Sequence, residues 1–484
     1  MAETEKTRAK KHFISFMAQQ VGEDLKEVSY DPVDNCSLRY EDEKGELIKS
    51  RFPLIILLAT QIENGDDVRI TIFKAQSNSN DLDRKADENI DANFELFKTE
   101  FKKMIERLAE QKAPIIFTVN GSRGENVVSG IEVKDMRFDS NNESLQKLKS
   151  DIVACIQDDE VVYADTTFGE KPDTIAMHQA LTEIYTDRIL QDPIALCVYG
   201  QAVHENDLIL QAAIKDITTF ILRSGFRNMS GRTSEKRQSF EAEDTPMTFK
   251  KRYITFLSQA EDFKQYCFHA QSGDEWEYRG KRNRGVYYPI IPVIEKTVED
   301  GDEIIITAVK FVDEDGSDIQ GGTIETIMES NAVCLKDDMD DLQECLAKVG
   351  QNFKFIIDPL KTTFNASWSS LEQLCNDLID RIKPGEIIYA DTTFGEKPDT
   401  VALHQALVET AINRASFVRI ADCVYGYIDR SHGDNPRNKL KSIKEFIYQG
   451  ADEMLFRQRG MKGMEADAIK DILRAFWSEG GDAE

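Results

Sequence analysis

The residues best suited to chemistry lie in one short segment that occurs twice. Tyr163–Thr174 reads Tyr-Ala-Asp-Thr-Thr-Phe-Gly-Glu-Lys-Pro-Asp-Thr, and Tyr389–Thr400 repeats it letter for letter. The segment offers hydroxyls that can donate to phosphate or ribose oxygens, a lysine, and a glycine that allows close backbone approach. Its proline suits the first turn of a helix, whose N-terminus adds amide donors and partial positive charge. These parts favour binding of a phosphodiester.

The repeated loop does not suit a triphosphate. From Asp165 to Asp173 it carries three acids and one lysine, and the chain has neither GxxxxGK[ST] nor GxGxxG. A structural interpretation also stays open, in which the loop is a turn held by a local Asp165–Lys171 ion pair. The two copies are identical in sequence, which favours a role in ligand binding over a purely structural role. The candidate ligand-binding residues of the loops are Asp165, Thr166, Phe168, Gly169, Glu170, Asp391, Thr392, Phe394, Gly395 and Glu396, beside Thr167, Lys171, Thr393 and Lys397.

Two further pairs of residues recur with the loop. His178 and His404 sit one turn into the following helix, where packing or a supporting hydrogen bond is favoured over a general-base role. Tyr199 and Tyr425 end a later strand of each copy, and either stack on a base or pack.

The outer edge of the site is expected to be asymmetric. Arg123 follows a predicted strand and can reach a ligand, whereas the second copy has Asp358-Pro-Leu-Lys361 there. The basic run Arg279–Arg284 occurs in one copy only and is expected to be a solvated loop.

The repeat extends beyond the loop and defines the domains. Lys11–Gln19 pairs with Lys251–Gln259, and Cys197-Val-Tyr-Gly200 recurs as Cys423-Val-Tyr-Gly426. The order of matches is the same in both halves, so a unit of about 230 residues is duplicated. We expect one domain over 1–225, a linker over 226–246 and a second domain over 247–484.

Hydrophobic spacing predicts alternating strands and helices in each unit. In the first unit we expect strands at 13–18, 68–73, 115–119, 161–164 and 194–199, and helices at 53–62, 89–111, 145–156, 173–190 and 208–222. Such alternation favours an α/β fold with two Rossmann-like parallel-sheet domains in tandem. The repeated loop then lies at the carboxyl end of a strand, where such sheets bind ligands.

Composition narrows the class of protein. The chain has 484 residues, 41% of them hydrophobic, and a formal net charge of −27. That charge argues against a protein that coats DNA or RNA. Eight cysteines occur without a CxxC pair, so we expect free thiols and no metal site. No apolar run is long enough to cross a bilayer and no signal-peptide core begins the chain, so a cytoplasmic protein is expected.

The organisation resembles the CARF family, the Rossmann-fold sensors of type III CRISPR systems. Asp165-Thr-Thr-Phe-Gly-Glu-Lys-Pro172 is similar to the family's ligand loop, Lys11–Phe16 looks like its opening strand, and Ile194–Gly200 like its later strand ending in Tyr-Gly. The resemblance implies an intramolecular pseudo-dimer in which both loops face one cyclic oligoadenylate. It also implies ligand contacts at the ends of the opening strands, from Ala18, Gln19, Ser258 and Gln259.

No effector-domain signature is seen in the sequence, so three functions remain open. The first is a ring nuclease, in which a ribose 2′-hydroxyl attacks its own phosphate without metal or cofactor. Lys171 and Lys397 would stabilise charge, with Thr167 and Thr393 positioning the phosphate. The second is a sensor that binds the ring and signals through a separate partner protein. The third is an unrelated Rossmann enzyme of nucleotide metabolism. Tetra-adenylate is favoured over hexa-adenylate as the ligand.

Overall fold

The computed structural model describes most of both halves of the chain. The described residues are 10–19, 27–32, 38–42, 44–63, 66–76, 83–111, 118–119, 122–123, 131–137, 141–188, 193–205, 208–230, 250–259, 265, 268–270, 285–312, 323–363, 367–412, 418–427 and 438–458. The predicted basic loop 279–284 lies outside them.

Each half contains a seven-stranded sheet of the same topology. The strand orders are β2-β9-β8-β7-β1-β3-β6 and β11-β16-β15-β14-β10-β12-β13. All neighbours are parallel except the β8–β9 and β15–β16 pairs. The first sheet comprises β1 (Lys10–Phe16), β2 (Tyr30–Pro32), β3 (Asp67–Gln76), β6 (Ile131–Arg137), β7 (Glu160–Asp165), β8 (Ile194–Glu205) and β9 (Leu208–Asp216). The second comprises β10 (Lys250–Phe256), β11 (Phe268–Ala270), β12 (Glu303–Val312), β13 (Lys354–Thr363), β14 (Glu386–Asp391), β15 (Arg419–Tyr427) and β16 (Asn438–Ser442).

The central strands are buried because helices cover both faces of each sheet. Every residue of β1 after Lys10 is buried, and so is every residue of β10 after Lys250. The buried polar exceptions are paired, as burial of charge requires. His12 Nδ1 lies 3.0 Å from Glu160 Oε2, and Arg252 donates to both oxygens of Glu386 at 2.8 and 2.9 Å.

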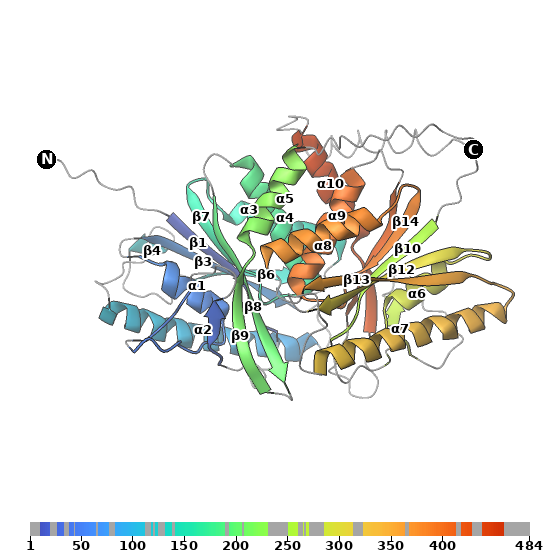
Figure 1. The fold of residues 1–484 in the computed structure, drawn as a ribbon. Helices are drawn as coiled ribbons and strands as arrows, with labels where there is room; N and C mark the ends of the chain where they lie inside the picture. Colours follow the sequence, from blue (N-terminus) through green and yellow to red (C-terminus); the bar gives the residue numbers. More distant parts are fainter. Residues whose placement is uncertain are drawn as a thin grey trace.

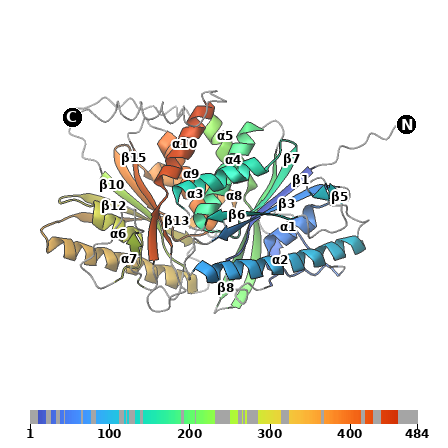
Figure 2. The same ribbon diagram turned by 180° about the vertical axis from the view of Figure 1, so that it is seen from behind.

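The helices form an inner layer between the sheets and an outer layer beyond them. In Figures 1 and 2, α4 and α9 lie between the two sheets, while the long helices α2 and α7 run along the lower side. The helices of the first half are α1 (Pro53–Gln61), α2 (Asp83–Gln111), α3 (Asn142–Cys155), α4 (Lys171–Asp187) and α5 (Thr218–Ser230). Those of the second half are α6 (Ile290–Thr297), α7 (Thr323–Ala347), α8 (Trp368–Arg381), α9 (Lys397–Ile412) and α10 (Lys444–Gln458).

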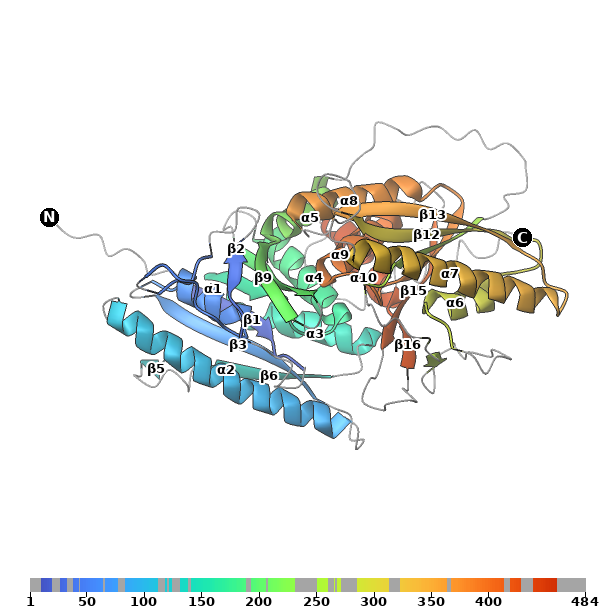
Figure 3. The same ribbon diagram turned by 60° about the horizontal axis from the view of Figure 1, so that its bottom comes forward.

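The expected intramolecular pseudo-dimer is confirmed. Helix α4 packs on α9, α5 on α8 and α10, and α3 on α10, so the halves meet through helices near the middle of the molecule (Figure 3). Arg223 of α5 pairs with Glu372 of α8 at 2.5 Å and lies 4.3 Å from the centre of the Trp368 ring. Lys149 of α3 pairs with Glu453 of α10.

One predicted element was wrong. Residues 208–222 form strand β9 followed by α5, not one helix. The Thr218 N–H donates to Asp216 Oδ1 at 2.8 Å, which starts a new helix after the strand. Of the predicted strand 115–119, the structure describes Thr118–Val119, which form β4 and pair with β5 (Ser122–Arg123) in a separate two-stranded sheet. The next described strand of the seven-stranded sheet is β6. Residues 226–230 of the expected linker extend α5, and 231–246 lie outside the described residues.

Among the described helices, none combines the length and apolarity needed to span a membrane.

Candidate functional site

Asp165, at the end of β7, organises the first loop. Its Oδ1 accepts from the backbone N–H and the hydroxyl of Thr167 at 2.9 and 2.5 Å, and its Oδ2 accepts from Ser15 at 3.0 Å. The Thr166 hydroxyl donates to the Val198 carbonyl at 3.0 Å. Both threonine hydroxyl protons are therefore used inside the fold, and the loop is held rigidly against β1 and β8.

The second loop repeats these contacts. Asp391 accepts from the Thr393 N–H and hydroxyl at 2.9 and 2.5 Å, and from Thr255 at 2.9 Å. The Thr392 hydroxyl donates to the Val424 carbonyl at 3.1 Å. Ser15 and Thr255, which the sequence analysis did not single out, are thus equivalent anchors of the two loops.

Gly169 has the left-handed backbone conformation that the sequence suggested, but another side chain of the protein fills the space where a Cβ atom would lie. Its φ is +87°, and a Cβ there would lie 2.9 Å from the Phe16 ring. Gly395 has a φ of +85° and faces Phe256 in the same way. The glycine therefore allows close packing on the first strand of each half, whereas a close ligand approach was expected.

The loop passes directly into the next helix. Lys171 is the first residue of α4 and Pro172 follows, as a proline in the first turn should. Glu170 occupies the N-cap position, and its backbone N–H donates to Asp173 Oδ2 at 2.9 Å. Asp173 thus supports the helix start from inside the first turn. In the second half the Glu396 N–H donates to Asp399 at 3.3 Å.

The two loops contact each other across the boundary between the halves. Lys171 Nζ donates to the Thr393 carbonyl, and Lys397 Nζ donates to the Thr167 carbonyl. A local Asp165–Lys171 ion pair, the structural alternative, is not among the ion pairs of the described residues. Both lysine residues are partly exposed.

The tyrosines at the strand ends also cross the boundary. Tyr199 donates its hydroxyl proton to Glu396 Oε2, and Tyr425 donates to Glu170 Oε2. Both tyrosines are buried, at 6% and 7% exposed. Each therefore holds the glutamate that precedes the lysine of the opposite loop.

Two buried lysines were missed by the sequence analysis. Lys215 lies opposite Tyr199 in the β8–β9 pair, and Lys441 lies opposite Tyr425 in the β15–β16 pair. Their charges act on Asp399 and Asp173 of the opposite half. The prediction of a helix over 208–222 hid this relationship, because it removed the strand that places Lys215 beside Tyr199.

Burial shifts the protonation of the loop lysines. Loss of solvation lowers the pKa of Lys171 to about 8, opposed by the negative charges of Glu396 and Asp391. The pKa of Lys397 is likewise lowered to about 8, opposed first by Glu170. Each ammonium can therefore release a proton close to neutral pH.

Carboxyl groups under the loops are shifted in the opposite direction. Burial raises the pKa of Asp173 to about 7 and that of Asp399 to about 8. Burial also raises the pKa of Asp165 and Asp391, although hydrogen bonds from Thr167 and Thr393 oppose the rise. Strongly shifted groups of both signs are thus concentrated where the halves meet, as is common at functional sites.

His178 and His404 lie inside the helix layer. Both are buried, and burial lowers the pKa of each to about 3, so the imidazoles are neutral. His404 Nε2 lies 3.0 Å from Gln179 Nε2 of the other half. These contacts agree with the packing role that the sequence analysis favoured.

Just after β1 and β10, some polar groups form hydrogen bonds and others have no hydrogen-bond partner among the described residues. The Ala18 carbonyl accepts from Asn93 at 2.9 Å, and the Ser258 carbonyl accepts from Asn331 at 2.6 Å. The side chains of Gln19 and Gln259 are half-buried, and the amide nitrogen of each is buried with no hydrogen-bond partner among the described residues. These two amides are donors that a ligand or water can satisfy.

The expected equivalence of Arg123 with Asp358 and Lys361 was wrong. Arg123 belongs to β5, and its side chain lies outside the described residues. Asp358 of β13 lies opposite Thr307 of β12. The equivalent residue of the first half is Glu132 of β6, which lies opposite Thr71 of β3.

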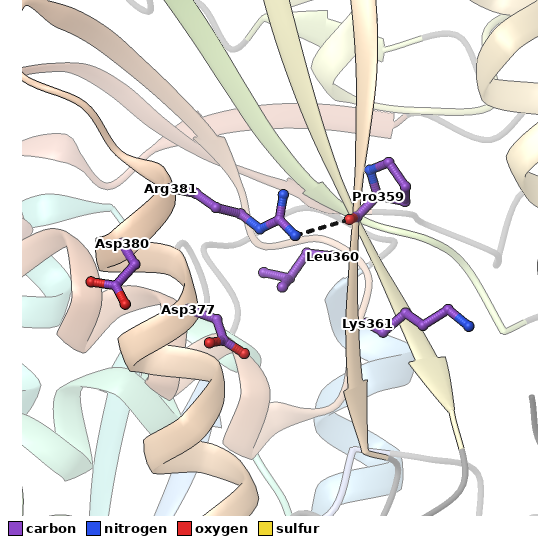
Figure 4. A pocket seen from close by; sticks show the side chains of 6 residues that line it. All are labelled: Pro359, Leu360, Lys361, Asp377, Asp380 and Arg381. Carbon is purple, nitrogen blue, oxygen red and sulfur yellow. Dashed lines mark hydrogen bonds between the residues drawn. The ribbon is translucent and has the colours of Figure 1, made fainter. Parts of the chain in front are cut away.

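An open pocket of about 540 Å³ lies between β13 and α8 (Figure 4). It is lined by Pro359, Leu360, Lys361, Asp377, Asp380 and Arg381, none of which belongs to the repeated loops. Arg381 donates to the Pro359 carbonyl at 3.2 Å and also pairs with Asp358.

Within the described part of the chain, no cluster of three or more His, Cys, Asp or Glu side chains is arranged to hold a metal ion. The described cysteines are free thiols.

Comparison of the chain with protein-family models gives no match, and comparison with curated proteins gives none either.

Proposed function

We propose that the chain binds one cyclic oligoadenylate where its two loops meet and opens the ring by attack of a ribose 2′-hydroxyl. The reciprocal placement of Lys171 and Lys397 is the observation that carries this proposal. It brings two identical loops, each at a strand's carboxyl end, together in one pseudo-twofold site. The nature of the ligand comes from the motif resemblance to the CARF family.

The pseudo-twofold arrangement favours a ligand with an even number of nucleotides. Equivalent donors are presented twice, so a ring with its own twofold axis can satisfy both loops alike. A three-membered ring would leave polar groups of one loop mispaired, at about 1–3 kcal/mol for each buried group. Between four and six nucleotides, the family resemblance favours cyclic tetra-adenylate.

The site supplies donors for such a ring. An ammonium has three N–H groups, so each lysine can hold its carbonyl and still contact a phosphate oxygen. The N-termini of α4 and α9 add partial positive charge. The unsatisfied amides of Gln19 and Gln259 offer further donors to bases or phosphates. Thr167 and Thr393 act indirectly, because their hydroxyls fix the loops through Asp165 and Asp391.

Ring opening would depend mainly on how the reacting atoms are aligned, because the attacking 2′-hydroxyl belongs to the ligand itself. The attacking 2′-oxygen, the phosphorus and the leaving 5′-oxygen must lie in line while negative charge is stabilised. Two loops held rigidly against their sheets, each with a cation at its rim, suit that task.

The test is incubation of each ring with excess protein in EDTA, followed by chromatography. Linear products with a 2′,3′-cyclic phosphate from the tetra-adenylate are expected. Intact but bound ring would reduce the function to a sensor that needs a separate partner. Failure to bind any of the three rings would reject the proposal and favour another nucleotide-binding role for the fold.

A further inference from the structure

Each loop lysine belongs to a set of three residues drawn from both halves. Lys171 is anchored on the Thr393 carbonyl, and Glu396 is the carboxylate that acts most strongly on it. Tyr199 of the first half binds Glu396. We name Lys171, Glu396 and Tyr199 the first composite set. The second composite set is Lys397, Glu170 and Tyr425. Lys397 is anchored on the Thr167 carbonyl, Glu170 is the carboxylate that acts most strongly on it, and Tyr425 binds Glu170.

The glutamates of these sets are held from both halves of the chain, because Glu170 also forms a capping box with Asp173 at the start of its own helix α4. Asp173 accepts the backbone N–H of Glu170, and Asp399 accepts that of Glu396. Asp165 and Asp391 hold the threonines. The glutamate carboxylates are also bound by a tyrosine of the opposite half, and both glutamate residues are partly exposed.

We propose that Glu396 and Glu170 accept the proton of the attacking 2′-hydroxyl, and that Lys171 and Lys397 donate the proton taken by the leaving 5′-oxygen. This inference rests on the proposed ring opening. The 2′-oxygen forms a bond to phosphorus as its proton passes to the glutamate. The bond from phosphorus to the 5′-oxygen breaks, and that oxygen takes a proton from the ammonium. The products are a 2′,3′-cyclic phosphate and a 5′-hydroxyl, and solvent then carries the proton from the glutamic acid back to the amine.

The tyrosines are positioning residues in this scheme. A hydrogen bond from Tyr199 fixes one oxygen of Glu396 and leaves the other for the 2′-hydroxyl. Loss of the tyrosine hydroxyl should therefore slow cleavage more than it weakens binding of the ring.

The experiment uses the full chain and cyclic tetra-adenylate as the probe. Single-turnover cleavage from pH 5 to 9 and calorimetric binding are measured for wild type, for the Glu170→Gln, Glu396→Gln double variant, and for Glu344→Gln as an exposed control. We expect the double variant to bind the ring but to cut it about 10²–10⁴-fold more slowly, as for loss of a general base. Tyr199→Phe with Tyr425→Phe should lower the single-turnover rate constant while the affinity for the ring changes little.

The outcomes separate the two proposals. If the double variant binds and cuts like wild type, the glutamates are not proton acceptors and this inference is overturned while the proposed function stands. If wild type binds the ring without cutting it, the inference is again overturned and only binding remains. If wild type does not bind, the proposed function itself fails. Each single glutamate variant should retain cutting through the intact set, which guards against a double variant that does not fold.

Discussion

Lys171 and Lys397 each donate to a carbonyl of the loop that carries the other lysine. A cation of one half is thereby anchored on the other half, and neither loop can be complete without its partner. The arrangement predicts that the two lysines contribute alike to any ligand bound between them.

Lys171→Ala and Lys397→Ala should each weaken binding of cyclic tetra-adenylate. Loss of one charge-assisted hydrogen bond costs about 1.5–3 kcal/mol, roughly ten- to a hundredfold in affinity. Calorimetry measures the change, with Lys147→Ala as a control because that side chain is 63% exposed. Equal affinities for the double variant and wild type would mean that the loops serve structure alone.

Tyr199→Phe and Tyr425→Phe should destabilise the chain even without ligand. Each change removes a hydrogen bond to a carboxylate across the boundary, at about 1.5–3 kcal/mol. Urea unfolding measures the effect. Tyr163→Phe is the matched control, since its ring is also buried and stacks on Phe13 at 4.8 Å. A Tyr199→Phe variant no less stable than the Tyr163→Phe control would contradict the cross-half contact.

Stability should depend on pH through Asp173 and Asp399. Their folded pKa values, about 7 and about 8, lie above the ordinary value of 3.8, so the folded state binds protons that the unfolded state has lost. Stability attributable to these groups therefore falls as pH rises from about 4 to about 8. Asp399→Asn should flatten that decline in urea unfolding measured at several pH values, whereas exposed Asp380→Asn should not. Parallel curves for Asp399→Asn and wild type would show that the carboxyl is not shifted.

Gly169→Ala should destabilise more than a glycine substitution in an open turn. Both Gly169 and Gly385 have positive φ, so alanine is strained at either position, by about 1–2 kcal/mol. At Gly169 the new methyl group also meets the Phe16 ring, while nothing lies within 4 Å at Gly385. Overpacking adds about 1–3 kcal/mol. Thermal unfolding of the two variants compares them directly, and equal losses would show that the Phe16 contact is unimportant.

The features that depend on local pattern and repetition could be predicted from the sequence. Short, mostly apolar stretches predicted β1 and β7, and the exact repeat of Tyr163–Thr174 indicated two similar domains. The sequence did not reveal β9, because the apolar residues from Leu208 onward fit a helix as well as a strand, and pairing with β8 decides between them. Contacts across the halves were equally hidden. Nothing in the loop sequence shows that Lys171 reaches Thr393, since that contact depends on how complete domains pack.

The most direct test of the central claim is a calorimetric titration of the full chain with cyclic tri-, tetra- and hexa-adenylate at one salt concentration. If the two loops form a single pseudo-twofold site, one ring should bind per chain, and cyclic tetra-adenylate should bind most tightly. Two rings per chain, or tightest binding by the three-membered ring, would contradict the account.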